Sequence, residues 1–313
     1  MLKSYLFFYF VLIIQLFVFS NCIYSQEVKI FTLKDFDLKG TVKSCKVITN
    51  YGKEVFEFNK YGLLTKLITR FNATDYEKTY YKYTANGELL EKRVENYRDG
   101  VFDKDISIAN IYTLDTVSGK KITEKIISYT KEFIDQYEYT YDVEDRLIGV
   151  KRTNNTGIDN TQITYEDYKG EYTITYFLND VILKSIRTSK KEKKPYNKHV
   201  LVKEFMGGVP TKAFEQVYNV KEKIINVTNF SFNEKAKQFV PNKVTNYSYN
   251  DIGLLAEENT TIDGKKEVLK NYIYQYDNGE RGNWIKKIIT PDNTFTSRKI
   301  EYYIPATTEI SKP

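Results

Sequence analysis

The sequence predicts an all-β protein, a long antiparallel meander of consecutive hairpins, and three observations lead to it. The 313 residues include 28 Tyr, 19 Phe and one Trp but only 15 Gly, 6 Pro and 2 Met, a composition that favours pleated sheet. Many segments alternate between apolar and polar residues, and none has an apolar stripe with the helical period of about 3.6 residues. A short aromatic pattern also recurs along the chain.

Bulk composition describes an ordinary globular chain. With 41% hydrophobic residues, 28% charged residues and a net charge of +6, the sequence resembles neither a membrane helix bundle nor a disordered polyelectrolyte. One His and two Cys make most metal sites hard to build. We therefore expect no cofactor, and the small scattered charge gives no reason to expect a nucleic-acid partner.

Residues 1–25 have the pattern of a secretory signal peptide. Lys3 precedes an apolar run from Tyr5 to Phe19, which is shorter than the ~20 residues of a spanning helix. Cleavage after Ser25 leaves Gln26 first, similar to signal peptides of the Bacteroidota. The expected location is outside the cytoplasm: periplasm, cell surface or extracellular medium.

A second processing site competes with the first. The segment from Phe19 to Cys22 resembles a lipobox, in which Cys22 is the candidate lipidation residue. Asn21 stands where a small residue is expected. A lipid anchor on Cys22 is the one membrane association that we expect for the mature chain.

The recurring unit is an aromatic-x-aromatic strand, a polar turn, Gly and then Leu. Its copies are Phe56–Leu64, Tyr81–Leu89, Tyr139–Leu147, Tyr247–Leu255 and, with a longer turn, Tyr274–Trp284. If the turn is type I and Gly takes the left-handed conformation as a bulge, the second aromatic faces the Leu of the next strand. The predicted pairs are Phe58 with Leu64, Tyr83 with Leu89, Tyr141 with Leu147, Tyr249 with Leu255 and Tyr276 with Trp284. Asp145 replaces the Gly of the third copy and should carry the strain of a positive φ.

One segment without apolar residues divides the chain. We predict an N-terminal β-repeat half over 26–188, a basic loop or linker over 189–198 and a C-terminal β-repeat half over 199–313. The basic segment is interpreted as a solvated hairpin tip or linker, with binding of a polyanion as the alternative.

The repeated units resemble the YD repeats of the rearrangement-hotspot family, in which aromatic-x-Tyr-Asp is followed by Gly-Arg-Leu. Tyr139–Leu147 fits this pattern best, and the Gly282-Asn283-Trp284 end of the last copy looks like a variant of exported Bacteroidota proteins. The resemblance covers about residues 37–303 and implies a sheet of consecutive hairpins, as a twisted sheet, an open solenoid or a barrel. A toxin-delivery role is not implied, because the sequence shows no further domain after Tyr303.

The sequence contains no clear set of catalytic residues. Whether the chain is an enzyme therefore stays open, and we favour a non-enzymatic role. Cys45 and His199 lie in alternating segments and are interpreted as strand residues. The clustered carboxylates Asp142, Glu144 and Asp145, like Asp277 and Glu280, stand where polar turns are required.

The sequence therefore favours a non-enzymatic exported β-repeat protein, a scaffold or recognition surface of the cell envelope that binds a glycan or another envelope protein. Tyr249, Tyr276 and Trp284 are the candidate ligand-stacking residues, expected to be exposed on one sheet face. Two alternatives stay open. One is a glycosidase-like hydrolase with two carboxylates in an acidic cleft, and the other is a lipid or lipoprotein carrier with an apolar cavity.

Overall fold

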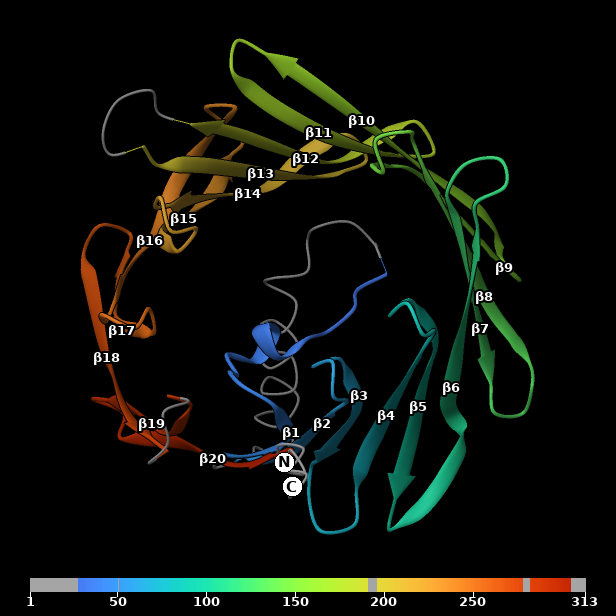
Figure 1. The fold of residues 1–313 in the computed structure, drawn as a ribbon. Helices are drawn as coiled ribbons and strands as arrows, with labels where there is room; N and C mark the ends of the chain where they lie inside the picture. Colours follow the sequence, from blue (N-terminus) through green and yellow to red (C-terminus); the bar gives the residue numbers. More distant parts are fainter. Residues whose placement is uncertain (1–27, 50, 191–195, 278–281, 305–313) are drawn as a thin grey trace, which may run out of the picture.

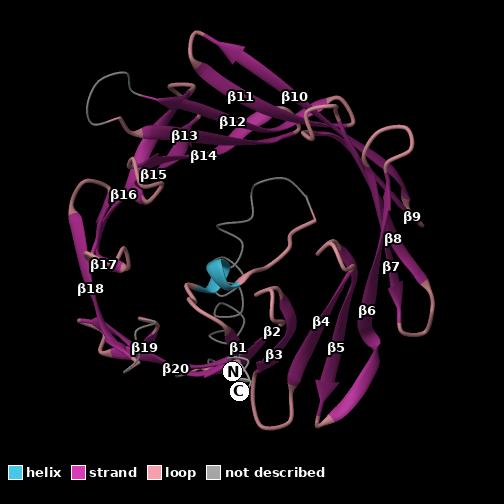
Figure 2. Cartoon of the chain, viewed as in Figure 1, coloured by secondary structure: helices cyan, strands magenta, loops and turns pink. Residues whose placement is uncertain are grey.

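The computed structural model describes residues 28–49, 51–190, 196–277 and 282–304, and nearly all of them lie in strands. Twenty strands form one sheet (Figures 1 and 2). Within the described residues the single helix is a 3-10 turn, η1 (Leu33–Phe36). The strands are β1 (Val42–Thr49), β2 (Gly52–Phe58), β3 (Leu64–Arg70), β4 (Tyr76–Tyr83), β5 (Leu89–Arg98), β6 (Val101–Asp115), β7 (Lys121–Ser128), β8 (Phe133–Tyr141), β9 (Leu147–Asn154), β10 (Gly157–Tyr168), β11 (Glu171–Leu178), β12 (Val181–Lys190), β13 (Lys198–Met206), β14 (Val209–Tyr218), β15 (Ile224–Asn233), β16 (Gln238–Tyr249), β17 (Leu255–Ile262), β18 (Lys266–Tyr276), β19 (Trp284–Thr290) and β20 (Thr294–Tyr302).

The sheet is a closed meander barrel. Every strand pairs antiparallel with its successor, and the last strand, β20, pairs with β1, where Arg298 lies opposite Val47. The sequence left open a twisted sheet, an open solenoid or a barrel. The structure is a barrel, because neither β1 nor β20 is a free edge. Unpaired edges are templates for association with other chains, and a closed barrel removes them.

All five predicted cross-strand pairs are confirmed. Phe58 lies opposite Leu64, and the same register recurs in the other four copies. Each pair sits beside a bulge, and the Gly after the turn is left-handed, with φ of 86° at Gly87. Asp145 takes this place in the third copy with φ of 64°, as predicted.

The described residues before β1, 28–41, run inside the barrel, which the sequence did not predict. Figure 1 shows η1 surrounded by the sheet. Phe36 of η1 packs on Phe56 and Phe58 of β2, with ring centroids 4.6 and 5.5 Å apart. These side chains belong to a core cluster built on Leu38, Val42, Cys45, Phe56, Phe58 and Leu64.

A side-chain clasp fastens the entry of β1 to the turn before β19. Asn283 is 1% exposed, and its Oδ1 accepts a hydrogen bond of 2.8 Å from the backbone N–H of Lys39. Its Nδ2 donates to the Lys39 carbonyl and to the Tyr302 hydroxyl, at 2.9 Å each. Tyr302 in turn donates to Asp277. The clasp therefore joins the two ends of the described chain where the barrel closes.

The described segments contain no helix that is long and apolar enough to cross a membrane. The signal segment 1–25, with Cys22, and the centre of the basic segment, 191–195, lie outside the described residues. The flanks of the basic segment belong to β12 and β13, which pair with each other through Lys190 and Lys198.

Candidate ligand-binding site

The position of η1 identifies the inner face of the sheet. Phe56 and Phe58 contact η1 and therefore point inward, and side chains alternate along each strand. Residues directly opposite each other in neighbouring strands share a face, so the register carries this assignment around the barrel. On β4, for example, Thr79 lies opposite the inward Leu67, which places Tyr81 and Tyr83 on the inner face as well.

Tyrosines line this inner face on most strands. We call them the inner tyrosine wall: Tyr81, Tyr83, Tyr112, Tyr137, Tyr139, Tyr141, Tyr165, Tyr172, Tyr176, Tyr218, Tyr247, Tyr249, Tyr272, Tyr274, Tyr276 and Tyr302. Neighbouring rings along a strand lie nearly parallel, with centroids 6.2 Å apart for Tyr137 and Tyr139 and 6.4 Å apart for Tyr274 and Tyr276.

Four of these tyrosines are anchored in the same way. The hydroxyl donates to the backbone carbonyl of the first residue of the preceding strand, at 2.6 to 2.9 Å. The pairs are Tyr83 with Leu64, Tyr165 with Leu147, Tyr249 with Ile224 and Tyr274 with Leu255. Neighbouring strands are only about 4.8 Å apart, so a hydroxyl that reaches the next backbone lays its ring along the wall.

Cations lie over several of these rings. Lys120 stands 4.3 Å from the centroid of Tyr141, Arg146 4.9 Å from Tyr165 and Lys223 5.6 Å from Tyr249. Such contacts are attractive because the ring face is electron-rich. The wall therefore offers aromatic faces, hydroxyls and positive charge together.

A buried carboxylate fixes the wall between β6 and β8. Glu124 is 8% exposed and accepts hydrogen bonds from Asn110 Nδ2 at 2.6 Å, from the Tyr112 hydroxyl at 2.8 Å and from the Tyr139 hydroxyl at 2.6 Å. Burial and the Glu124 charge raise the pKa of Tyr112 and of Tyr139. Because three donors satisfy the Glu124 carboxylate, we assign this residue a structural role.

The predicted stacking residues all lie on the inner face. Tyr276 lies opposite Trp284, while Tyr249 belongs to a different hairpin and faces Leu255. Trp284 is only 5% exposed, contrary to the expected exposure, because Arg298 covers its ring at 3.4 Å and Tyr274 packs against it at 6.0 Å. A ligand that stacks on the indole must therefore displace Arg298. Cys22 lies outside the described residues.

The reactive side chains singled out in the sequence are strand residues. Cys45 on β1 is 1% exposed, and burial raises the pKa of its thiol. His199 on β13 lies on the outer face with its Nδ1 3.2 Å from Glu215. Within the described residues, the contacts of Cys45 and His199 do not place a nucleophile beside a base.

Carboxylates at hairpin ends hold turns. Asp142 accepts the backbone N–H groups of Glu144 and Arg146 at 2.9 Å each, which closes the turn of the third copy. Glu280 lies outside the described residues. In the part of the chain that the structure describes, no group of three His, Cys, Asp or Glu side chains could hold a metal ion.

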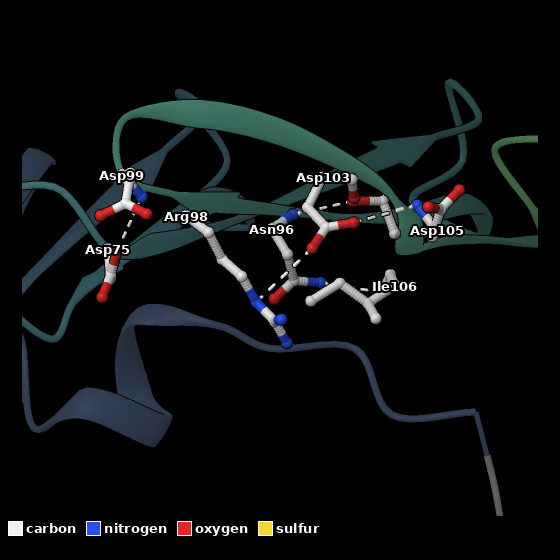
Figure 3. Close-up of polar contacts among 8 residues, drawn as sticks. Asp75, Asn96, Arg98, Asp99, Asp103, Asp105 and Ile106 are labelled. Carbon is white, nitrogen blue, oxygen red and sulfur yellow. Dashed lines mark hydrogen bonds and ion pairs between the residues drawn. The ribbon is translucent and has the colours of Figure 1, made fainter.

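The end of the β5–β6 hairpin shows the same use of carboxylates (Figure 3). Asp75 accepts the backbone N–H of Asp99 at 2.8 Å, and its hydrogen bonds with Asn72 and Asp99 lower its pKa. Asp103 accepts the N–H of Asp105 at 3.2 Å and lies 3.5 Å from the Arg98 guanidinium. The carboxylates of Asp75 and Asp103 therefore hold the backbone of the loops here.

Comparison with known proteins gives only distant likenesses. No protein-family model and no curated protein sequence matches the chain. A porin-like protein from Bacteroides uniformis aligns over 84% of this chain and 98% of its own, at 10% identity and a TM-score of 0.36. A porin-like protein from Bacteroides vulgatus aligns over 85% of this chain and 100% of its own, at 9% identity and a TM-score of 0.29. The TcdB2-TccC3 structure aligns over 76% of this chain and 16% of its own, at 13% identity and a TM-score of 0.16. Scores this low carry no argument about function.

Proposed function

We propose that the chain is an exported, non-enzymatic β-barrel protein of the cell envelope, a degenerate YD-repeat protein whose inner tyrosine wall recognises a glycan. The observation that carries the proposal is the anchoring of the wall tyrosines through their hydroxyls. A glycan presents apolar C–H faces together with hydroxyls. A fixed tyrosine offers the matching combination of an aromatic face and a polar edge, and because it is already ordered, binding costs little side-chain entropy.

The outer face of the barrel supports a location in water. On β4 and β5, the outward Lys78 and Lys82 lie opposite Glu95 and Glu91, and the outward Arg93 lies opposite Tyr80. A transmembrane barrel carries an apolar band outside, where each Lys or Arg near the bilayer centre costs about 2–4 kcal/mol. The charged outward side chains of β4 and β5 do not fit such an apolar band. Export rests on the signal peptide predicted over 1–25.

The two alternatives make different demands on the inner wall. A lipid carrier needs an apolar cavity, whereas this wall carries phenol hydroxyls and carboxylates such as Glu124 and Glu258, which accepts from Tyr272 at 2.9 Å. A glycosidase needs two carboxylates about 5–10 Å apart on either side of the bond that it cleaves. Glu124 is held by three donors on the wall, which does not favour that role.

A glycan array with the purified exported protein tests the proposal. We expect binding of at least one glycan, and at least tenfold weaker binding by Tyr276→Ala. The matched control is Tyr80→Ala, which removes a tyrosine from the outer face of β4. Melting temperatures of both variants separate lost binding from lost folding.

Other outcomes of the same experiment decide against the proposal. An equal loss of glycan binding in Tyr276→Ala and Tyr80→Ala would show that the inner tyrosine wall is not the binding surface. If no glycan on the array binds and a substrate screen detects hydrolysis, the protein is the carboxylate hydrolase. If lipid co-purifies with the protein, it is the lipid carrier. Capture of one envelope protein without glycan binding would make protein recognition the function.

A further inference from the structure

A cavity of about 260 Å³ lies inside the barrel between η1 and the wall. Its lining comes from η1 with the residue that follows it and from β1, β2, β19 and β20. Pockets for drug-sized ligands span about 300–1,000 Å³, so this cavity has the size for a small molecule.

Opposite charges stand on opposite sides of this cavity. Val47 lies between Glu54 on β2 and Arg298 on β20, as the cross-strand neighbour of both. Two strand spacings put the backbones of Glu54 and Arg298 about 10 Å apart, and the short Val47 side chain forms the floor between them. Among the described residues, the Glu54 carboxylate makes no hydrogen bond or ion pair, and burial raises its pKa.

Two cations, Arg298 and Lys287, lie on the side of the cavity opposite Glu54. Arg298 donates from Nη2 to the Phe36 carbonyl at 2.9 Å, but its Nε and Nη1 are buried with no hydrogen-bond partner. Lys287 lies 5.5 Å from the Trp284 ring, and burial together with the Arg298 charge lowers its pKa. Asp37 lines the same cavity and attracts both cations at longer range, without an ion pair to either of them within the described residues.

We propose that this cavity binds a small zwitterion, a free α-amino acid, with its carboxylate toward Arg298 and Lys287 and its ammonium toward Glu54. Buried charges are costly unless they are paired. A simple anion would leave Glu54 unpaired, and a simple cation would leave Arg298 and Lys287 unpaired, whereas a zwitterion pairs both sides at once. Trp284 lines this cavity, but no residue of the inner tyrosine wall does, so neither proposal depends on the other.

Isothermal titration calorimetry of the purified protein with each of the standard α-amino acids tests the inference. We expect at least one to bind and to raise the melting temperature, since a ligand of the native state stabilises it. For that amino acid, the decarboxylated amine and the deaminated acid should each bind at least tenfold more weakly. No binding of any amino acid, or equal binding of either analogue, would overturn the proposal.

Variants of the lining locate the binding. Glu54→Gln and Lys287→Gln should each weaken amino-acid binding at least tenfold, while the outward neighbours on the same strands, Glu57→Gln and Lys286→Gln, should leave it unchanged. Val47→Leu keeps every charge but fills the floor, and it should also abolish binding. Unchanged binding by folded Glu54→Gln and Val47→Leu proteins would place the ligand elsewhere and refute the assignment.

Discussion

The hydroxyl of Tyr83 donates a 2.6 Å hydrogen bond to the backbone carbonyl of Leu64, the first residue of the preceding strand. The same bond recurs at Tyr165, Tyr249 and Tyr274. Within a hairpin, the aromatic residue and the Leu pair across the turn. The hydroxyl bond instead joins the start of one strand to a ring on the next, so the repeat stabilises both kinds of strand junction.

Removing one such hydroxyl should lower stability by the value of one hydrogen bond. We expect Tyr83→Phe to reduce the free energy of unfolding by about 0.5–1.5 kcal/mol, because the ring stays while the Leu64 carbonyl loses its donor. Denaturant titration measures the change. The matched control is Tyr80→Phe on the outer face of the same strand, which should change stability by less than about 0.5 kcal/mol. Equal effects of the two substitutions would contradict a specific role for the bond.

The turn glycine of the second copy gives a second prediction. Gly87 has a φ of 86°, and an added Cβ would meet only Leu63 at an ordinary 3.7 Å, so backbone strain is the main cost of Gly87→Ala. We expect a loss of about 1–2 kcal/mol. Gly149→Ala on β9 is the control, since Gly149 has no positive φ and its added Cβ would have 3.9 Å of space. A cost at Gly149 as large as that at Gly87 would argue against the left-handed bulge.

Local geometry made the hairpins predictable from the sequence. The turn and the bulge lie within a few residues of the pair that they align, so the contact of Tyr83 with Leu89 follows from spacing alone. The positive φ of Asp145 follows from the same alignment, because this residue stands where the other copies have Gly.

Long-range features could not be predicted in this way. The pairing of Val47 with Arg298 joins strands from opposite ends of the chain, and no spacing rule fixes it. Tyrosines stand on both faces of β4, Tyr80 outside and Tyr81 and Tyr83 inside, so the sequence did not show which of the two faces is inside. The cavity depends on Phe36 and Asp37 folding back into the barrel, which left no periodic signal. The sequence analysis noted Asn283 in the Gly282-Asn283-Trp284 segment, but its contact with Lys39 forms only in the closed barrel.

The Asn283 clasp should be sensitive to loss of its amide. In Asn283→Asp, Oδ1 can still accept from the Lys39 N–H, but the two donors to the Lys39 carbonyl and to Tyr302 are replaced by a carboxylate oxygen. We expect the free energy of unfolding to fall by about 1–3 kcal/mol at pH 7. The control is the exposed Asn246→Asp on the outer face of β16, where the acceptor of the Asn226 bond is kept. Hydrogen exchange should also rise first at the β1–β20 junction, and unchanged exchange there would show that the clasp does not secure closure.

Lys184 makes stability depend on pH. It lies on the inner face and is 9% exposed, and burial lowers the pKa of its ammonium to about 8, only partly offset by Glu204. The unfolded chain holds this proton more tightly, with a pKa near 10.5, so at pH 7 the charged side chain costs folding free energy. Between pH 8 and 10.5 the unfolded state binds more protons than the native state, and the contribution of Lys184 to stability rises with pH.

Lys184→Met should therefore stabilise the protein at pH 7. We expect a gain of about 1–3 kcal/mol, below the full value of the pKa shift because the contact of Lys184 with the Tyr176 ring at 5.4 Å is lost. At pH 10 most of the gain should vanish, since the native lysine is then neutral. Denaturant titrations at both pH values measure this, with the exposed Lys151→Met on β9 as the control that should show neither effect. If Lys184→Met were less stable than the native chain by the same amount at pH 7 and at pH 10, the effect would not depend on the charge of Lys184, and this would contradict a pKa lowered by burial.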